Sequence, residues 1–438
     1  MKNGKKIIRV GQIGCGTVGS GVYRILMENG EVISRRTGCE IAVKRVAVRD
    51  LSDPRYVEVP EGELTTDALE VIRDPEVDIV AEVIGGVEPA RTFILEAIAC
   101  GKHVVSANKE LMSTHGEEIL SAAEEAGVDV AYEASVGGAI PILLPLKYSL
   151  AGNNVDSILG IVNGTTNYVL TRMSEEGLSF SEALRKAQER GYAEADPSAD
   201  VEGRDAAAKL AILASMAFNS RVTLGDVYTE GISAITPDDM RFGRDLGYVI
   251  KLLAVAKDEP DGISVRVHPT MIPKDHPLAA VRDENNAIFV SGNASGELMF
   301  YGKGAGSLPA ASAVVGDIIT ISRNMLTGGR MVGCTCFYRK PLKDMAEVVC
   351  RYFMIFDAPD RPGVLARIAG VFGDNGVSIK SVIQHGMGRE ARIVLVTHAV
   401  KERSIRATLK GLEELRAVNR IASVIRVEDR EPEEGEGG

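Results

Sequence analysis

The 438-residue chain lacks the features that mark membrane-spanning, secreted and nucleic-acid-binding proteins. No apolar run is long enough to cross a bilayer, since the longest candidate, residues 206–218, is interrupted by Lys209. The first ten residues, MKNGKKIIRV, contain no cleavable apolar region and so predict no signal peptide. Acidic residues outnumber basic ones by 61 to 50, which disfavours a nucleic-acid surface. We therefore expect a cytoplasmic protein that binds neither membrane nor nucleic acid.

Cysteine is scarce, with six residues in the chain and no CxxC pair. This composition fits a reducing compartment and a protein without a structural zinc site. Cys334 and Cys336 are two residues apart, which is a poor spacing for metal ligands. We interpret them as lying on alternate faces of a β-strand.

The length exceeds what one core usually supports, so two or three domains are expected. From residue 6 to about 132, nearly continuous Val/Ile/Ala runs alternate with helical patterns, which predicts a parallel sheet covered by helices, a Rossmann-type doubly wound α/β fold. The predicted strands are IIRVGQIG, EIAVKRVAV, VDIVAEVIG, KHVVSAN and VDVAYEAS, and the predicted helices span 17–28, 68–73, 89–100 and 116–126.

The residues after 140 predict further domains with a different order of helices and strands. Residues 141–304 favour an α+β domain, with helices over 141–149, 167–176, 181–190 and 201–218 and strands over 263–268 and 287–291. The glycine-rich segment and helix of 305–340 are expected to complete the first domain, residues 1–140. Residues 350–428 follow the order β-α-β-β-α-β, which is typical of a ferredoxin-like fold. The acidic segment 429–438 is expected to be disordered.

A glycine-rich loop, Gly14-Cys15-Gly16-Thr17-Val18-Gly19, lies between the first strand and the first helix. This is the setting of a dinucleotide fingerprint, in which glycines and a helix N-terminus approach the pyrophosphate. Arg49, at the end of the second strand, favours the 2′-phosphate of NADP, and Arg55 is nearby. Asp50 keeps NAD possible, because an acid at this position contacts the ribose hydroxyls of NAD.

Three polar segments are candidates for the chemistry. Lys109 follows a predicted strand, where open α/β sheets place ligand-binding groups. Glu194 lies in the polar loop GYAEADPSAD between two predicted helices. Asp205 and Lys209 are spaced i, i+4 on one helix face. Because the neighbours of Lys209 are apolar, burial is expected to lower its pKa toward neutrality, as suits a proton donor and acceptor; a surface ion pair between Asp205 and Lys209 is the alternative.

These segments resemble one family. GYAEADPSADVEGRDAAAK is similar to the signature of homoserine dehydrogenases, and GCGTVGSGV, SANKELM, EASVGGAIPI, IVNGTTNYVL and YGKGAGSLPAASAVVGDI resemble its other motifs in the same order. The segment DAPDRPGVLARIAGVFGDNGVSI resembles an ACT domain, an amino-acid-sensing module. The resemblance implies reversible NAD(P)H-dependent reduction of L-aspartate 4-semialdehyde to L-homoserine, in threonine, methionine and isoleucine biosynthesis. It also implies that residues 141–304 catalyse and dimerise and that residues 350–428 regulate.

The resemblance also implies site residues and partners. Lys209 and Lys109 are the implied catalytic residues, and Glu194 and Asp205 the implied substrate-binding residues. The implied cofactor-binding residues are Gly14, Gly16, Thr17, Val18, Gly19, Arg49, Lys109, Gly191, Gly302, Gly304 and Gly306. Backbone oxygens of Glu133, Val136, Gly138 and Ile140 are the implied ligands of a sodium ion. Threonine is the implied effector, and a homodimer or homotetramer is expected.

Two alternatives were weighed against this interpretation. A semialdehyde dehydrogenase that forms a thiohemiacetal would need an activated cysteine, and neither Cys15 nor Cys100 has a histidine in its motif. A catalytically inactive NADP-binding sensor is the other alternative. The presence of Glu194, Asp205 and both lysines disfavours it.

Overall fold

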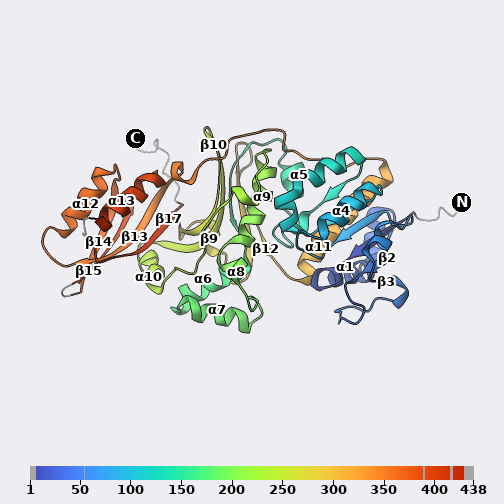
Figure 1. The fold of residues 1–438 in the computed structure, drawn as a ribbon, viewed down its shortest axis with the longest axis horizontal. Helices are drawn as coiled ribbons and strands as arrows, with labels where there is room; N and C mark the ends of the chain where they lie inside the picture. Colours follow the sequence, from blue (N-terminus) through green and yellow to red (C-terminus); the bar gives the residue numbers. More distant parts are fainter. Residues whose placement is uncertain (1–5, 54, 388–389, 415–417, 429–438) are drawn as a thin grey trace. The chain divides into compact units, whose positions relative to one another are not determined.

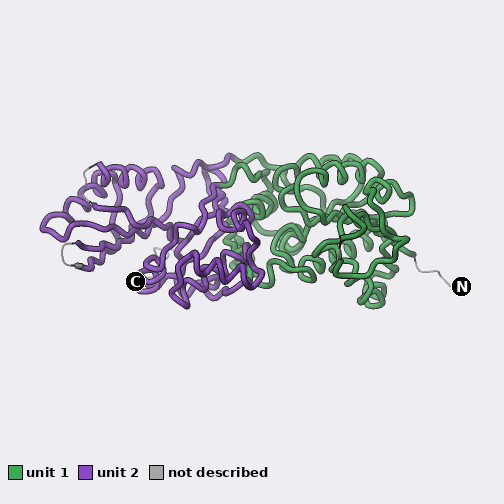
Figure 2. The backbone as a smooth tube through the Cα atoms, turned by 60° about the horizontal axis from the view of Figure 1, so that its bottom comes forward, with its two compact units in different colours: residues 1–162, 207–227, 285–340 green, residues 163–206, 228–284, 341–438 purple. Residues whose placement is uncertain are grey.

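The computed structural model describes residues 6–53, 55–387, 390–414 and 418–428. The chain divides into two compact units (Figure 2). Unit 1 consists of residues 1–162, 207–227 and 285–340, and unit 2 consists of residues 163–206, 228–284 and 341–438. The domain boundaries expected from the sequence stay a prediction, and the acidic segment 429–438 lies outside the described residues. Among those residues, no helix combines the length and the apolar character that a membrane span requires.

Unit 1 contains the doubly wound domain that the sequence predicts (Figure 1). Its parallel sheet has the order β3-β2-β1-β4-β5-β6. The strands are β1 (Ile7–Ile13), β2 (Glu40–Ala47), β3 (Leu64–Thr65), β4 (Ile79–Glu82), β5 (His103–Ser106) and β6 (Val130–Ala131). The helices are α1 (Thr17–Glu28), α2 (Gly30–Thr37), α3 (Ala68–Ile72), α4 (Ala90–Ala99), α5 (Lys109–Ala126) and α11 (Ser307–Thr327). Strands β2 and β3 are added on one side of β1 and strands β4 to β6 on the other, so the sheet has, between β1 and β4, the switch point at which such folds bind ligands.

Helix α11 completes the core of this domain although it is far away in sequence. Its buried residues Val314 and Ile318 pack in one cluster with Val10 of β1 and Val22 of α1. A Cβ atom on Gly21 would lie 2.8 Å from the Cβ of Ala311, so a glycine is what lets α1 and α11 approach this closely. Unit 1 also contains an antiparallel arrangement in the order β12-β11-β7. Its strands are β7 (Val155–Ile161), β11 (Asn285–Gly292) and β12 (Gly296–Lys303).

Unit 2 combines a helical layer with a sheet in the order β9-β10-β17-β13-β15-β14. Its first part comprises α6 (Gly164–Glu176), α7 (Phe180–Glu189), α8 (Ser198–Val201), β8 (Tyr228–Thr229), α10 (Pro237–Asp245), β9 (Tyr248–Glu259) and β10 (Gly262–Pro273). Its second part comprises β13 (Val349–Pro359), α12 (Val364–Asp374), β14 (Ile379–Met387), β15 (Glu390–Thr397), β16 (Val400–Lys401), α13 (Glu402–Glu414) and β17 (Arg420–Val427). The second part confirms the ferredoxin-like fold, with β16 as a short addition.

Three local predictions were wrong. The helix expected over 201–218 is interrupted, because Gly203 adopts a left-handed conformation (φ 83°) between α8 and α9 (Arg204–Ala217). The helix expected over 141–149 begins at Leu143 and continues as a π-helix over Pro145–Ser149. Cys334 and Cys336 are not on alternate faces of a strand: residues 329–337 form no strand, and both cysteines line the same small cavity.

The two parts of unit 2 are joined by a buried ion-pair network where β10 runs parallel to β17. Arg266 on β10 is 1% exposed and pairs with Glu428, which directly follows β17. The second oxygen of Glu428 accepts a bond from Lys257 Nζ at 2.6 Å. Burial alone would raise the pKa of Glu428, but the two cations outweigh it and lower the pKa to about 2.

This network predicts a pH-dependent stability difference. Because the folded pKa of Glu428 is depressed from 4.5, its contribution is present above pH 4.5 and is lost as the pH falls toward 2. Glu428→Gln leaves the Arg266 charge unpaired, so we expect a loss of about 3–5 kcal/mol near neutral pH. Urea unfolding of both proteins between pH 7 and pH 3 measures this, with exposed Glu413→Gln as the control. A difference between wild type and Glu428→Gln that is independent of pH would contradict the assignment.

Candidate active site

The glycine-rich loop between β1 and α1 is shaped to receive an anion. Gly14 has a φ of 102°, and a Cβ on Gly19 would lie only 2.3 Å from the Gly14 oxygen, so both positions require glycine. A Cβ on Gly16 would meet no atom within 4 Å, which leaves open space beside the loop. No side chain caps the N-terminus of α1. Its first backbone N–H groups can therefore bind phosphate oxygens.

A pocket of about 830 Å³ extends from this loop to the end of β2. Arg49, Asp50 and Arg55 line it. The Asp50 carboxylate accepts hydrogen bonds from the Ser52 backbone N–H (2.8 Å) and hydroxyl (2.7 Å), which lower the pKa of Asp50. Arg55 donates to the backbone oxygens of Asp50 and Leu51. Arg49 is exposed, so its guanidinium can reach a ligand without giving up an interior contact.

A buried carboxylate organises the ends of β4 and β5. Glu82 is fully buried and accepts bonds from the Ser106 hydroxyl (2.7 Å) and from the backbone N–H of Ile84 (2.9 Å). Asn108 caps α5 through Leu111 N and donates its amide N–H to the Gly86 oxygen at 2.6 Å.

Lys109 is the first residue of α5 and directly follows this cap. Its backbone is therefore fixed at the carboxyl edge of the parallel sheet. Sequence reasoning found the lysine but missed Glu82. The signal that could have revealed Glu82 is an acid that directly follows the apolar run of a central strand.

The second lysine, Lys209, lies on α9, a largely buried helix. Every residue from 206 to 217 except Lys209 is buried, and Lys209 itself is partly exposed. Its ammonium donates a hydrogen bond to the backbone oxygen of Val162, just after β7, at 2.7 Å. The expectation of apolar neighbours is confirmed, but the side chain is half-buried rather than enclosed.

Asp205, one turn before Lys209 on α9, is held by Asn163. The Asn163 amide donates to Asp205 Oδ2 at 2.8 Å and to Asp200 Oδ1 at 2.7 Å. Its oxygen caps α6 by accepting from the Thr166 N–H at 2.9 Å. Asn163 is 5% exposed, so its amide cannot exchange these partners freely with water. One buried amide therefore fixes two carboxylates and a helix end at once.

The loop between α7 and α8 carries Gly191 and Glu194. Gly191 has a φ of 75°, and the next residue, Tyr192, accepts a hydrogen bond from the Thr165 hydroxyl at 2.6 Å. The Thr165 hydroxyl also lies 3.0 Å from Asp200 Oδ2, to which it can donate instead, and this connects the loop to the Asn163 cluster. Glu194 is exposed, and its backbone oxygen accepts from Gln188 at 3.1 Å. Its carboxylate is available to a ligand.

The predicted cation loop is a tight turn in unit 1. The Glu133 side chain accepts hydrogen bonds from the backbone N–H groups of residues 142–144. Its own N–H donates to Asp317 Oδ2 at 2.8 Å. Burial raises the pKa of both carboxyls, and the charge of Glu133 raises that of Asp317 further. Gly138 (φ 59°) allows the main chain to turn, so that backbone oxygens rather than side chains are presented.

The turn packs against the second glycine-rich segment. A Cβ on Gly138 would lie 2.5 Å from the Gly304 backbone, and one on Gly304 would overlap the Asn286 side chain. At Gly306 the chain turns into α11, where the Ser307 hydroxyl donates to the Thr17 oxygen at 2.5 Å. The segment 302–306 is thus tied to the phosphate loop of α1 rather than being a loose linker.

Comparison with known proteins identifies the family. Family models for the homoserine dehydrogenase NAD-binding domain, homoserine dehydrogenase and the ACT domain match residues 14–133, 141–319 and 352–417. A homoserine dehydrogenase from Corynebacterium glutamicum is 46% identical, with 96% of each chain covered. The chain belongs to the homoserine dehydrogenase family.

Solved structures agree with this assignment. A homoserine dehydrogenase from Thiobacillus denitrificans superposes with a TM-score of 0.91 at 42% identity, covering 97% of this chain and 100% of that one. A hyperthermophilic archaeal homoserine dehydrogenase in complex with NADPH has a TM-score of 0.62 at 25% identity, covering 75% of this chain and 99% of that one. The alternative of an inactive sensor has no support in these relatives.

The activity of this homoserine dehydrogenase is the NAD(P)-dependent interconversion of L-aspartate 4-semialdehyde and L-homoserine. The predicted roles of individual residues stay predictions. Among the described residues, no group of three or more His, Cys, Asp or Glu side chains could hold a metal ion.

Proposed function

We propose that Lys209 is the proton donor and acceptor of the homoserine dehydrogenase reaction and that Asp205 positions the substrate. The observation that supports this is the way both side chains are held. Lys209 donates to the oxygen of Val162, and Asp205 accepts from the amide of the next residue, Asn163. The two side chains are one helical turn apart on α9. The residues that follow β7 therefore hold the Lys209 ammonium and the Asp205 carboxylate on the same face of this helix.

The remaining charged residues have distinct tasks in this proposal. As negative charge develops on the aldehyde oxygen, the ammonium groups of Lys209 and Lys109 stabilise it, and Lys209 protonates it. In the reverse direction, Lys209 accepts the hydroxyl proton of homoserine. The exposed carboxylate of Glu194 binds the substrate ammonium. A bound nicotinamide supplies or accepts the hydride.

NADP is the proposed cofactor. Uncapped N–H groups at α1 and the open space beside Gly16 fit a pyrophosphate, and the exposed Arg49 fits the 2′-phosphate. The Asp50 oxygen that accepts from Ser52 is already engaged, which reduces its capacity for a ribose hydroxyl. The NADPH complex of the archaeal relative supports the same choice. The glycines of 302–306 would allow the chain to approach the cofactor closely.

A sodium ion is proposed at the turn formed by residues 133–140. A hard cation takes oxygen ligands, and the backbone oxygens of Glu133, Val136, Gly138 and Ile140 are the proposed set. The positive φ of Gly138 and the anchored Glu133 side chain fit a turn that presents main-chain oxygens. The bound ion would stabilise the conformation of this turn.

The proton-transfer role of Lys209 is tested by Lys209→Ala. Alanine suits the helix, so the fold should persist, while loss of the acid–base group should lower kcat by about 100- to 10,000-fold. NADP affinity, measured by fluorescence titration, should stay unchanged. Lys186→Ala on the surface of α7 is the matched control and should keep full activity. A kcat for Lys209→Ala within a few-fold of wild type would exclude the role.

Cofactor choice is tested by Arg49→Ala. Since only NADP carries a 2′-phosphate, the Kd for NADP should rise about 10-fold or more, the worth of one charged hydrogen bond, while the Kd for NAD stays the same. Titration of the same preparation with both cofactors measures this, and NAD is the internal control. Equal changes for both cofactors would assign Arg49 to the loop rather than to the phosphate.

The ACT domain is proposed to bind threonine, at the loop before α12. Gly363 (φ 86°) begins this helix, no side chain caps it, and a Cβ there would meet nothing within 4 Å. Free N–H groups at the helix start suit an amino-acid carboxylate, and Asp360 suits the ammonium. Asp360 is oriented by a hydrogen bond from Gln384 at 3.2 Å.

We also propose that the enzyme is a homodimer or homotetramer in the cytoplasm.

Threonine regulation predicts a specific loss in Asp360→Ala. Threonine should inhibit the wild-type enzyme, whereas the variant should need roughly 10- to 150-fold more threonine, because it loses one hydrogen bond between charged groups, about 1.5–3 kcal/mol. The rate without threonine should be unchanged. Initial rates against threonine concentration measure this, with Asp374→Ala at the end of α12 as the control. Identical threonine curves for wild type and Asp360→Ala would refute the proposed binding site.

A further inference from the structure

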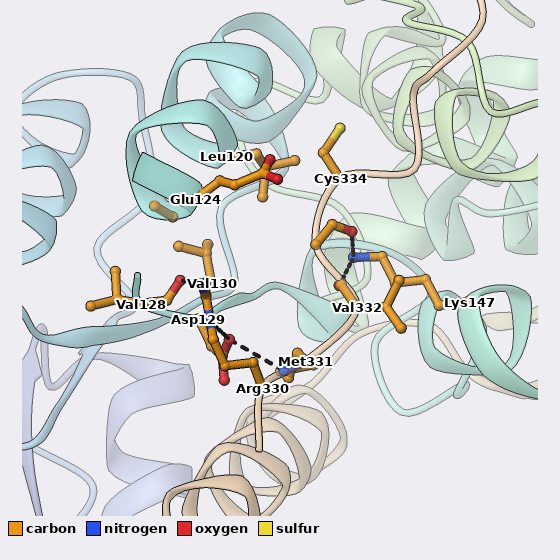
Figure 3. A pocket seen from close by; sticks show the side chains of 12 residues that line it. Leu120, Glu124, Val128, Asp129, Val130, Lys147, Arg330, Met331, Val332 and Cys334 are labelled. Carbon is orange, nitrogen blue, oxygen red and sulfur yellow. Dashed lines mark hydrogen bonds and ion pairs between the residues drawn. The ribbon is translucent and has the colours of Figure 1, made fainter. Parts of the chain in front are cut away.

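The segment after α11 holds two cysteines in a fixed conformation. Residues 330–334 line a pocket of unit 1 opposite Leu120 and Glu124 of α5 (Figure 3), and residues 334–336 line a smaller neighbouring cavity. Lys147 donates to the backbone oxygens of Val332 and Gly333, each at 3.2 Å. These bonds pin the chain immediately before Cys334, which reaches the pocket. The thiols are therefore presented by an ordered segment.

The two thiols lie close to each other and to a cation. Arg221 donates a hydrogen bond to the Cys334 sulfur at 3.1 Å. The Cys336 sulfur is 3.5 Å from the Ser215 oxygen on α9. Both cysteines are partly exposed and line one small cavity together with Arg221, Lys147 and Ser215. Two thiols separated by one residue and facing the same cavity are placed to form a bond with each other.

The surroundings favour the thiolate form of Cys334. The hydrogen bond from Cys336 lowers the pKa of Cys334 below that of an ordinary thiol, and Arg221 and Lys147 lower it further. Proton sharing and burial raise the pKa of Cys336 in turn. The acids of the adjoining pocket are Glu124 and Asp129, and Asp129 is engaged by Arg330 at 3.3 Å.

The other cysteines lack this setting. Cys15, Cys39 and Cys350 are buried. Cys100 is exposed at the end of α4, and among the described residues it has no cation or second thiol as a hydrogen-bond partner. Reactive cysteines are partly exposed and lie in electropositive surroundings. Only the pair at 334 and 336 meets both conditions among the described residues.

We propose that Cys334 and Cys336 form a dithiol site that hydroperoxides oxidise reversibly to a disulfide. The Cys334 thiolate attacks the peroxide, its S–O bond forms as the O–O bond breaks, and the leaving oxygen departs as hydroxide or alkoxide. Cys336 then attacks the sulfenic sulfur, forming the S–S bond and releasing water after proton transfer. The two thiols lose two electrons and two protons, and the peroxide is reduced.

Disulfide formation changes the contacts between these cysteines and helix α9. The Cys336 thiol proton, which can be donated either to Cys334 or to the Ser215 oxygen, is lost, and the Cys334 thiolate no longer neutralises Arg221. Ser215 and Lys209 lie on the same helix, α9. The site therefore places an oxidisable group against the element that carries the proposed acid.

The test uses the full-length enzyme, reduced and then exposed to hydrogen peroxide. After the remaining thiols are blocked with iodoacetamide, trypsin cleavage at Arg330 and Arg339 releases residues 331–339, which contain both cysteines and no others. The expected peptide is unalkylated at both positions and lighter by two hydrogens than the reduced form. Dithiothreitol should restore alkylation at both. A peptide that stays fully alkylated after peroxide overturns the proposal.

Two further measurements test the order of events. In the reduced protein at pH 6, iodoacetamide should label Cys334 at least about 10-fold faster than Cys100, because a larger fraction is thiolate. Cys336→Ser removes the resolving thiol, so peroxide should leave a sulfenic acid on Cys334 that dimedone traps. Cys100→Ser is the matched control and should form the disulfide normally. Equal labelling rates, or no dimedone adduct on Cys334, would contradict the assignment.

Discussion

Two consecutive residues at the end of β7 fix the charged groups of α9. The helix is buried from residue 206 to 217 except at Lys209, so a charged side chain on it must find a partner or remain partly in water. The Val162 oxygen supplies the partner of Lys209, and the Asn163 amide supplies that of Asp205. The same amide binds Asp200 and its oxygen starts α6. The positions of the proposed catalytic groups thus depend on a short stretch of backbone that cannot shift without breaking several buried hydrogen bonds.

The position of the proposed cofactor site follows from the topology of the parallel sheet. In the order β3-β2-β1-β4-β5-β6, the loops after β1 and β4 diverge, and Ile13 pairs with Glu82 at their ends. Glu82 accepts hydrogen bonds from the backbone N–H of Ile84, in the loop that follows it, and from the Ser106 hydroxyl. The buried carboxylate at this edge of the sheet therefore has hydrogen-bond partners for both of its oxygens. Lys109 begins the next helix beyond these hydrogen-bonded groups. Its placement is a consequence of the strand order.

Periodicity and glycine motifs predicted the sheet of the first domain, the phosphate loop and the ferredoxin-like domain, because these depend on local residue patterns. Helix α1, for example, spans residues 17–28 as expected. The break at Gly203 was missed because glycine in a helical pattern is ambiguous without knowing its φ. The role of Asn163 was missed for a different reason. Its three partners are 3, 37 and 42 residues away, and no local pattern reveals which carboxylates a buried amide will meet.

Strand pairing and ion pairs, as well as the linker, connect the ACT domain to the rest of unit 2. Strand β17 runs beside β10, and Arg426 of β17 pairs with Glu402 at the start of α13 and with Glu230 after β8. Arg426 is 8% exposed on its side chain, so moving α13 away would leave this buried charge with Glu230 as its remaining partner of the two. A separate connection links Arg392 of β15 to Asp238 on α10. Because α10 packs against α6, whose first turn is capped by Asn163, a change in the ACT sheet has a continuous packed route to Asp205. A domain on a flexible tether would have no such route, and a ligand bound to it could not bias the geometry around Asp205.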